Sequence, residues 1–328
     1  MHKLLMIPDT LLGWLDDRLE RRAGAGSWPL AALLLAPALF LIGVFSFYPM
    51  LYSVWMSLHA GKRGDGPFMG LENYREALGS ADFWHGFGVT FYYVAGTVPL
   101  TLVLGFAIAL CLHRIIRLRG FFRTLFFLPY VTSVVAAATV WRALLNPRNG
   151  VANLMLEWAG LPAQNWLLEP RGVLHIITSG MVPPDAGPSL ALCCVMAFDV
   201  WHGCGFAVVV FLAGLSAVPR ELEDAARIDG AGAFRTVWSV TLPLLSPTIF
   251  FLGVVGVIKG FQAFNSFYAL TQGGASGNSR NMVLYIYSQF YDYGYWGYGT
   301  AVSTLLTLAI VALTAVQWRV AGRRVHYA

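Results

Sequence analysis

Polar side chains that could bind a hydroxylated or charged solute interrupt two otherwise apolar stretches of the sequence. Two of them lie three residues apart on one stripe of a helix and could accept and donate hydrogen bonds. The other four share roughly one third of a helix circumference at about 100° per residue. Because polar groups inside a membrane span usually face the bundle interior, this set predicts a solute site. The first two are Asp199 and His202; the other four are Lys259, Gln262, Asn265 and Ser266, with Phe261 and Phe264 flanking them.

The partner of Lys259 determines which charge such a site would hold. If Lys259 pairs with Asp199, both charges are neutralised and a neutral glycoside is favoured. If Lys259 is unpaired, the cation would suit an anionic solute such as a glycerol phosphate. His202 could equally be satisfied by an interhelical hydrogen bond. The sequence leaves these alternatives open.

The sequence lacks the motifs of several kinds of catalytic site. It has no Gly-x-x-x-x-Gly-Lys-Ser/Thr phosphate loop, and Gly61-Lys62-Arg63 is the nearest approach to one. It has no His-Glu-x-x-His or Gly-x-Ser-x-Gly sequence and no paired carboxylates in the apolar stretches. The cysteines lack zinc spacing and are expected to be free, buried thiols. We therefore expect no enzyme activity, metal or cofactor on this chain.

The composition predicts that these residues are held by membrane helices. Of the 328 residues, 57% are hydrophobic and only 12% are charged, whereas soluble domains carry about 25% charged residues. A span needs about 20 mostly apolar residues and is expected to be helical, since lipid offers backbone groups no partners. The sequence predicts an all-α polytopic membrane bundle of six transmembrane helices, at about 28–58, 83–112, 121–145, 188–215, 242–270 and 298–320.

The distribution of Lys and Arg predicts the orientation of this bundle. With the N-terminus inside, the inner segments hold fourteen of these residues and the outer segments hold seven. Since cytoplasmic loops are enriched in Lys and Arg, both termini are expected to be cytoplasmic. Residues 1–27 contain several charges and no signal peptide, and we interpret them as a cytoplasmic amphipathic lead-in to a transmembrane domain at 28–328. No pattern of basic and aromatic residues predicts nucleic-acid binding.

A polar loop at 216–241, between the fourth and fifth spans, has the pattern of two short helices. Pro219 fits the first turn of a helix, and the acidic residues after it lie near the positive end of the helix dipole. Gly230 and Gly232 should break the helix before a second one begins at about Ala233 and runs into Leu242 and Pro243. Such a hairpin could be a compact docking knob for a partner, or only an amphipathic surface hairpin.

The spacing in this loop resembles the cytoplasmic coupling loop of binding-protein-dependent ABC importer permeases. That family pattern is Glu-Ala-Ala, three residues, Gly, nine residues, Ile, one residue and Leu-Pro. Two positions differ here, since an aspartate replaces the glutamate and a valine replaces the isoleucine. The corresponding residues are Asp224, Ala225, Ala226, Gly230, Val240, Leu242 and Pro243.

Two further stretches resemble the carbohydrate branch of that family, the maltose and glycerol-3-phosphate type. Phe264-Asn265-Ser266-Phe267, with the Leu-Thr-Gln-Gly-Gly at 270–274, is similar to the end of its fifth span. Gly70-Leu71-Glu72-Asn73-Tyr74 is similar to its first outer loop. The resemblance covers most of the chain from Pro29 onward, apart from residues 181–188.

The resemblance implies a type I ABC importer permease domain at 28–328 in the cytoplasmic (inner) membrane. Its partners would be a second homologous permease subunit, two ATP-binding cassette subunits that hold ATP and Mg, and an external solute-binding protein. The fifth span would contribute to the solute site. The coupling residues would transmit force without doing chemistry, and they are Glu223, Asp224, Ala225, Ala226, Asp229, Gly230, Ala231, Leu242 and Pro243.

Two other kinds of protein fit parts of the sequence. An ion-gradient-driven secondary carrier for a polar solute would need ionisable relays in its spans and usually has inverted repeats. Asp199 and Lys259 are the only strong charges well inside spans, and no repeat is visible. A membrane-embedded enzyme would need one of the catalytic motifs that are missing. A tyrosine-rich stretch at 285–298 is typical of an interfacial aromatic belt and could also belong to an outer gate.

Overall fold

The computed structural model describes residues 28–61, 66–114, 118–178, 180–184, 187–272 and 279–322. The predicted lead-in at 1–27 lies outside these residues. The described residues are helical apart from loops and two isolated β-bridges, His59 with Phe68 and Gly172 with Ser189. The all-α prediction is therefore confirmed. The chain divides into two compact units, residues 1–56 and 57–328, which are described separately.

The first unit contributes the predicted first span. It consists of α2 (Trp28–Ile42), a π-helical turn η1 (Gly43–Phe47) and α3 (Tyr48–Ser57), which ends at the start of the second unit. The π-turn lies just before Pro49, whose ring removes a backbone N–H that a regular α-helix would use. Most apolar side chains along 31–55 are exposed, as expected of a helix that lies in lipid.

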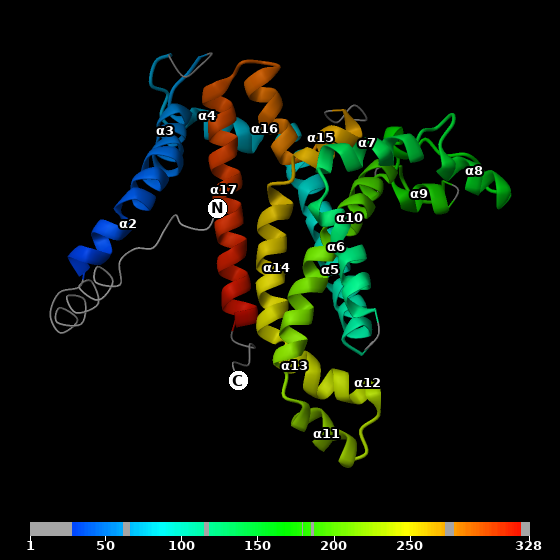
Figure 1. The fold of residues 1–328 in the computed structure, drawn as a ribbon. Helices are drawn as coiled ribbons and strands as arrows, with labels where there is room; N and C mark the ends of the chain where they lie inside the picture. The colour runs from blue at the N-terminus through cyan, green and yellow to red at the C-terminus, as the bar shows by residue number, and fades with distance from the viewer. Residues whose placement is uncertain are drawn as a thin grey trace, which may run out of the picture. The chain divides into compact units, whose positions relative to one another are not determined.

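Three long helices form the frame of the second unit (Figure 1). They are α5 (Ala81–Arg114), α10 (Leu190–Ala217) and α17 (Trp296–Ala321). Their length and hydropathy are sufficient for a membrane crossing, and they correspond to the predicted second, fourth and sixth spans. A short helix, α4 (Glu72–Gly79), precedes α5, and α16 (Met282–Tyr291) precedes α17.

The predicted third and fifth spans are not straight helices. The third consists of α6 (Arg119–Val131) and α7 (Val134–Leu144), which are bent by 93°. Pro129 lies in the last turn of α6, and Thr132 and Ser133 are extended, so the helix ends there. The described residues contain four long apolar helices, or up to six spans if each of two bent pairs is one span. The predicted count of six is therefore not confirmed.

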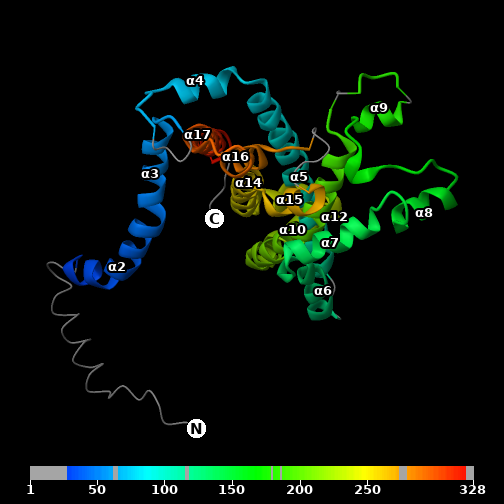
Figure 2. The same ribbon diagram turned by 90° about the horizontal axis from the view of Figure 1, so that it is seen from above.

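The fifth predicted span, at 242–270, is divided among several helices. It begins at α13 (Leu242–Leu244), which continues the segment formed by α12 (Ala233–Thr236) and the π-turn η4 (Val237–Thr241). Helix α14 (Ser246–Phe261) follows after a bend of 67°. It ends nine residues before the predicted boundary, and a separate helix, α15 (Asn265–Thr271), takes a new direction. Helices α15 and α7 lie side by side across the end of α10 (Figure 2).

Small residues allow the helices around the centre of the second unit to approach closely. A Cβ on Gly105 of α5 would lie 2.7 Å from the Cβ of Ala207 in α10. A Cβ on Gly260 of α14 would lie 2.8 Å from the side chain of Val94 in α5. Close backbone approach at small residues is a common means of helix association in membranes. These contacts hold α5, α10 and α14 around a central cavity.

The predicted outer loop at 146–187 is partly ordered. It contains α8 (Val151–Trp158), the 3₁₀ turn η3 (Trp166–Leu168) and α9 (Val173–Ile177). The buried Asn153 amide donates to the carbonyls of Pro147 at 2.8 Å and Gln164 at 3.0 Å, and its oxygen accepts from Trp166 Nε1 at 2.7 Å. This one side chain satisfies the backbone of a segment that lacks regular structure.

Candidate functional site

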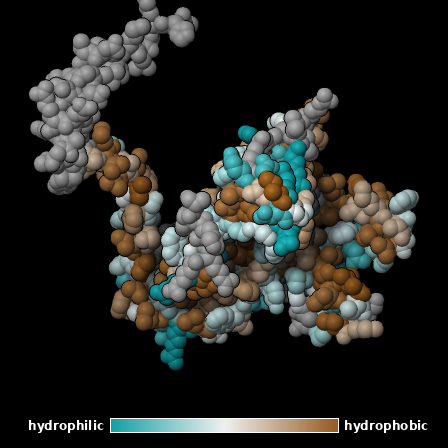
Figure 3. All heavy atoms as spheres, turned by 90° about the horizontal axis from the view of Figure 1, so that it is seen from below, coloured by the Kyte–Doolittle hydropathy of each residue, from teal (hydrophilic) through white to brown (hydrophobic). Residues whose placement is uncertain are grey.

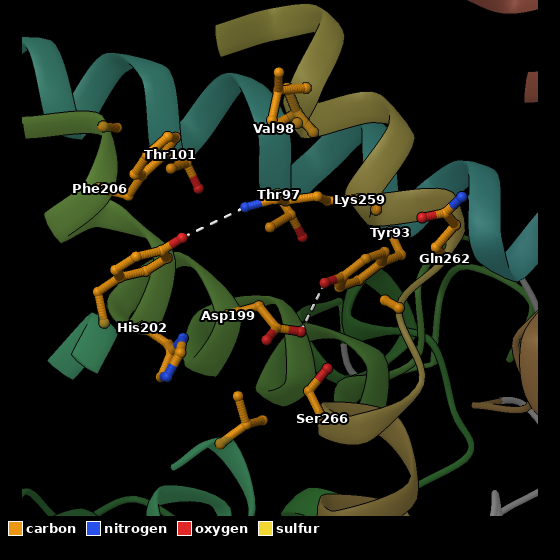
Figure 4. A pocket seen from close by; sticks show the side chains of 18 of the residues that line it. Tyr93, Thr97, Val98, Thr101, Asp199, His202, Phe206, Lys259, Gln262 and Ser266 are labelled. Atoms are coloured by element: carbon orange, nitrogen blue, oxygen red, sulfur yellow. Dashed lines mark hydrogen bonds between the residues drawn. The ribbon is translucent and has the colours of Figure 1, made fainter. Parts of the chain in front are cut away.

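A cavity of about 500 Å³ lies among α5, α6, α10, α14 and the chain between α14 and α15 (Figure 4). Its volume falls in the range of small-molecule sites, about 300–1,000 Å³. It contains polar and aromatic side chains, among them six of the seven predicted substrate-binding residues. The lining includes Tyr93, Thr97, Thr101, Tyr130, Asp199, His202, Phe206, Lys259, Gln262, Phe264, Asn265 and Ser266.

The polar residues at 262–266 reach the cavity by a different route from the predicted one. The sequence placed Lys259, Gln262, Asn265 and Ser266 on one face of a continuous helix, which is wrong because α14 ends at Phe261. The backbone at 262–264 runs alongside the cavity before α15 begins at Asn265. Both the broken segment and the end of α14 therefore present side chains to the same space.

Asn281 stabilises this break in the helix. Its amide donates to the carbonyl of Ala263 at 2.6 Å, and its oxygen caps α16 by accepting from the N–H of Leu284 at 3.0 Å. The Asn281 side chain is fully buried. Without it, the part-buried carbonyl of Ala263 would lose its hydrogen bond, which costs free energy. The break depends on a residue that lies 18 positions further along the chain, so helical periodicity could not have located it.

Phe261 does not line the cavity, although the sequence placed it beside the polar residues. Its side chain is 1% exposed and packs in the core, with its ring 6.2 Å from that of Phe87. Because α14 ends here, Phe261 and Phe264 do not flank the polar residues on one helix as expected. Phe264 does line the cavity and stacks with Tyr268 at 5.3 Å.

Asp199 is held by a tyrosine from another helix. The hydroxyl of Tyr93 on α5 donates to Asp199 Oδ2 at 2.6 Å, and the hydroxyl of Ser266 points toward the same carboxylate (Figure 4). His202 lies one turn further along α10, with its Nε2 3.3 Å from the carbonyl oxygen of Thr132 at the break between α6 and α7. The interhelical alternative for His202 thus has a specific partner.

Lys259 does not pair with Asp199. Both residues lie in the described part of the chain, and no ion pair joins them. The ammonium lies 3.5 Å from the hydroxyl of Tyr130, 5.0 Å from the ring centre of Phe206 and 5.8 Å from that of Tyr130. These distances are within the range of cation–π contacts. Lys259 is therefore held against two aromatic rings and exposed to the cavity.

Sequence reasoning missed the contribution of α5 and α6. Tyr93, Thr97 and Thr101 lie four residues apart on α5, and all three line the cavity with Tyr130 of α6. The hydroxyl of Thr97 is buried. The spacing of four is a helical face signal. Threonine and tyrosine are common in transmembrane helices, however, so this spacing alone does not distinguish a solute site from ordinary helix packing.

The polar loop forms a helical hairpin, as predicted, at the end of the unit where α17 ends (Figure 1). Helix α11 (Arg220–Ile228) ends in a Schellman motif, in which Gly230 N–H bonds to Arg227 O at 3.0 Å and Ala231 N–H bonds to Ala226 O at 2.9 Å. Gly230 has a φ of +80°, which favours glycine. Helix α12 then begins after Gly232.

The predicted coupling residues lie on this hairpin and in α13, with different exposures. Ala225, Asp229 and Gly230 are exposed, whereas Ala226, Ala231, Leu242 and Pro243 are half-buried. Asp224 is exposed and pairs with Arg227 of its own helix at 2.8 Å, and Arg227 also lies 3.7 Å from the half-buried Glu223.

Three large apolar side chains on the same segment were not singled out in the sequence. Ile228 is 86% exposed, Phe234 80% and Trp238 66%, and the last two rings stack at 6.3 Å. Viewed from this end, hydrophilic atoms surround a small hydrophobic area over the hairpin (Figure 3). Exposed apolar groups with a polar rim are typical of a protein interaction site.

The tyrosine-rich stretch lies on α16 and at the start of α17. Tyr285 and Tyr298 are joined through their hydroxyls at 2.9 Å, and the rings of Tyr287 and Tyr291 lie 4.6 Å apart.

Within the described residues, no three His, Cys, Asp or Glu side chains lie close enough together to hold a metal ion. The described lining of the cavity offers hydroxyl and amide groups, the Lys259 ammonium, the Asp199 carboxylate and aromatic faces.

Known proteins share this architecture. Residues 101–327 match the family model described as "binding-protein-dependent transport system inner membrane component". The chain is 30% identical to the trehalose/maltose transport system permease protein MalF of Thermococcus litoralis, over 93% of this chain and 98% of that protein. It is also 30% identical to the sn-glycerol-3-phosphate transport system permease protein UgpA of Agrobacterium fabrum, over 90% of this chain and 95% of that protein.

A solved structure has the same fold. A chain in the crystal structure of a bacterial ABC transporter involved in the import of the acidic polysaccharide alginate is similar to this one with a TM-score of 0.74 and 21% identity. The similarity covers 94% of this chain and 98% of that chain. The bent helices and the hairpin thus lie in a fold that a transporter uses.

Proposed function

The chain belongs to the family of binding-protein-dependent transport system inner membrane components, and on this premise we infer that it is the membrane-spanning permease subunit of an ATP-driven importer. Its solute is a small carbohydrate, glycoside or polyol phosphate. The relatives named for trehalose/maltose and sn-glycerol-3-phosphate transport support this range of solutes. We place the chain in the cytoplasmic membrane, with both termini and the hairpin on the cytoplasmic side.

The hairpin is the observation that carries this proposal. A permease without a phosphate loop must receive the energy of ATP from another chain, and it needs a rigid, accessible element for that purpose. Helix α11, the turn at Gly230 and helix α12 provide this element, and Ile228 and Phe234 provide exposed apolar contacts. We propose that the hairpin docks on one of two ATP-binding cassette subunits, which hold ATP and Mg.

The same element would transmit movement to the solute cavity. Helix α12 leads through η4 and α13 directly into α14, which carries Lys259. Displacement of the hairpin would therefore act on the helix that lines the cavity. A second permease subunit would complete the pathway, and an external solute-binding protein would deliver the solute. Alternating access in transporters is largely the rocking of one bundle against another around a fixed site.

A reconstituted complex tests this proposal. The chain is purified with its copurifying subunits and placed in proteoliposomes with its solute-binding protein, and uptake of labelled solute is measured with ATP or with an imposed proton or sodium gradient. Uptake that requires ATP supports the importer. Uptake that follows the ion gradient without ATP, or a complex without any ATP-hydrolysing subunit, would show that the chain is a secondary carrier or another kind of membrane protein.

The docking surface can be tested separately. Ile228→Glu places a charge on the exposed apolar part of the hairpin without disturbing the bundle, since this side chain is 86% exposed. We expect the ATP-hydrolysing subunits to be lost from the purified complex. Arg142→Glu, at the end of α7, changes a charge away from the hairpin and should leave the subunit composition unchanged. Normal recovery of those subunits with Ile228→Glu would exclude this docking surface.

A further inference from the structure

The solute cavity has one positively charged end. Lys259 projects from the last turn of α14 and is exposed to the cavity. Its described contacts are the hydroxyl of Tyr130 and the faces of Tyr130 and Phe206. Aromatic faces hold and orient an ammonium group, but they do not neutralise it. The positive charge therefore remains available to a ligand.

The carboxylate in the cavity is engaged elsewhere. Asp199 accepts a 2.6 Å hydrogen bond from Tyr93 and faces the hydroxyl of Ser266 (Figure 4). It forms no ion pair with Lys259. Thr97 lies one helical turn from Tyr93 and also lines the cavity. The second end of the cavity thus presents hydroxyl groups and a carboxylate, which suit the hydroxyls of a polyol.

We propose that the transported solute carries a single anionic group, a phosphate or a carboxylate, which binds Lys259 while its hydroxyl groups bind at Tyr93, Thr97 and Asp199. This inference rests on the proposed importer function and specifies its substrate class. An ammonium group that faces a cavity between helices attracts an opposite charge more strongly than a neutral hydroxyl. A neutral glycoside would leave Lys259 without such a partner during passage.

The geometry of Lys259 does not select between a phosphate and a carboxylate. An ammonium is a compact point charge on a flexible stem, without the planar fork with which arginine recognises carboxylates and phosphates in two-point contacts. The site should therefore accept either group, provided that one charge and adjacent hydroxyls are present. The cavity of about 500 Å³ is sufficient for a small solute of this kind.

Direct binding to the purified transporter complex, without the solute-binding protein, tests this inference. The probes are sn-glycerol 3-phosphate and glucuronate as anions, and glycerol, trehalose and maltose as neutral compounds. Binding is measured by calorimetry or by the ligand-dependent shift in Tm. We expect the anions to bind at least tenfold more tightly than the neutral compounds. Raising the ionic strength should weaken only the anions. The two anions separate phosphate recognition from carboxylate recognition.

Variants identify the residue responsible. Lys259→Met should remove the preference for anions, and Lys259→Arg should retain it. Arg142→Gln removes a positive charge from α7, outside the cavity. It should leave the binding of both the anions and the neutral compounds unchanged. Thr97→Val should weaken binding of the anions and of the neutral polyols to a similar extent. Preserved anion binding in Lys259→Met would overturn the inference.

Three outcomes separate this inference from the proposed function. ATP-dependent uptake of a neutral sugar that persists in Lys259→Met would overturn the anionic substrate class and leave the importer intact. Loss of neutral-sugar uptake in that variant, with no anion binding by the wild type, would indicate that Lys259 pairs with a carboxylate of the second permease, and would likewise overturn it. Absence of ATP-dependent uptake of every probe would instead contradict the importer function.

Discussion

The conformation of Gly230 gives a quantitative prediction for coupling. Its φ of +80° places it in the left-handed region, and a Cβ added there would meet no atom within 4 Å. Substitution therefore strains the backbone without causing a clash. A non-glycine residue in this region costs about 1–2 kcal/mol, which corresponds to a factor of about 5–30 in a conformational equilibrium. The hairpin turn should be less populated by that factor.

A series of variants makes this prediction specific. Gly230→Asn should have the smallest effect, because Asn tolerates the left-handed region better than other residues. Gly230→Ala should be intermediate, and Gly230→Val, which is β-branched, should be the most severe. Gly232→Ala is the matched control, since Gly232 has a φ of −68° and equally open surroundings. It should leave coupling unchanged.

The assay compares solute-stimulated ATP hydrolysis and uptake in proteoliposomes that contain equal amounts of assembled complex. We expect both to fall in the order Asn, Ala, Val at position 230, with the membrane content of the chain unchanged. Equal activity of Gly230→Val and Gly232→Ala would refute the reasoning, because the two sites differ mainly in the sign of φ.

Three further predictions concern stability. Asn281→Ala should destabilise the protein by about 2 kcal/mol, because it removes a helix cap and a hydrogen bond to the part-buried Ala263 carbonyl at the α14–α15 break; a Tm equal to that of the wild type would contradict this. Gly205→Val should prevent assembly of α6 on α10, since even a Cβ would lie 2.4 Å from a backbone oxygen, whereas Gly253→Ala has open space and should express normally in membranes. The Arg171 guanidinium holds the pKa of the buried Glu169 carboxyl below its ordinary value. The stability from this pair is therefore complete above about pH 4.3, the ordinary value, and is lost as the pH falls through the lowered pKa. The Tm difference between wild type and Glu169→Gln should disappear in that acid range.

The sequence alone determined the elements whose signals are local. A continuous apolar stretch predicts a span because a bilayer requires it, and the helices at 81–114, 190–217 and 296–321 follow that rule. The hairpin was predicted because Pro219 and Gly230 have backbone requirements that few other residues meet. The polar residues at 199–202 and 259–266 were predicted because a polar side chain is energetically costly in lipid, wherever its neighbours lie.

Only the tertiary structure decided how those residues meet. The break after Phe261 is fixed by Asn281, a residue distant in sequence, so no periodicity could place it or remove Phe261 from the cavity. The sequence could not decide whether Lys259 pairs with Asp199, because it does not give the distance between the helices that carry them. The hydroxyl of Tyr93, supplied by another helix, binds that carboxylate. Which charges pair depends on distances between helices, and packing sets those distances.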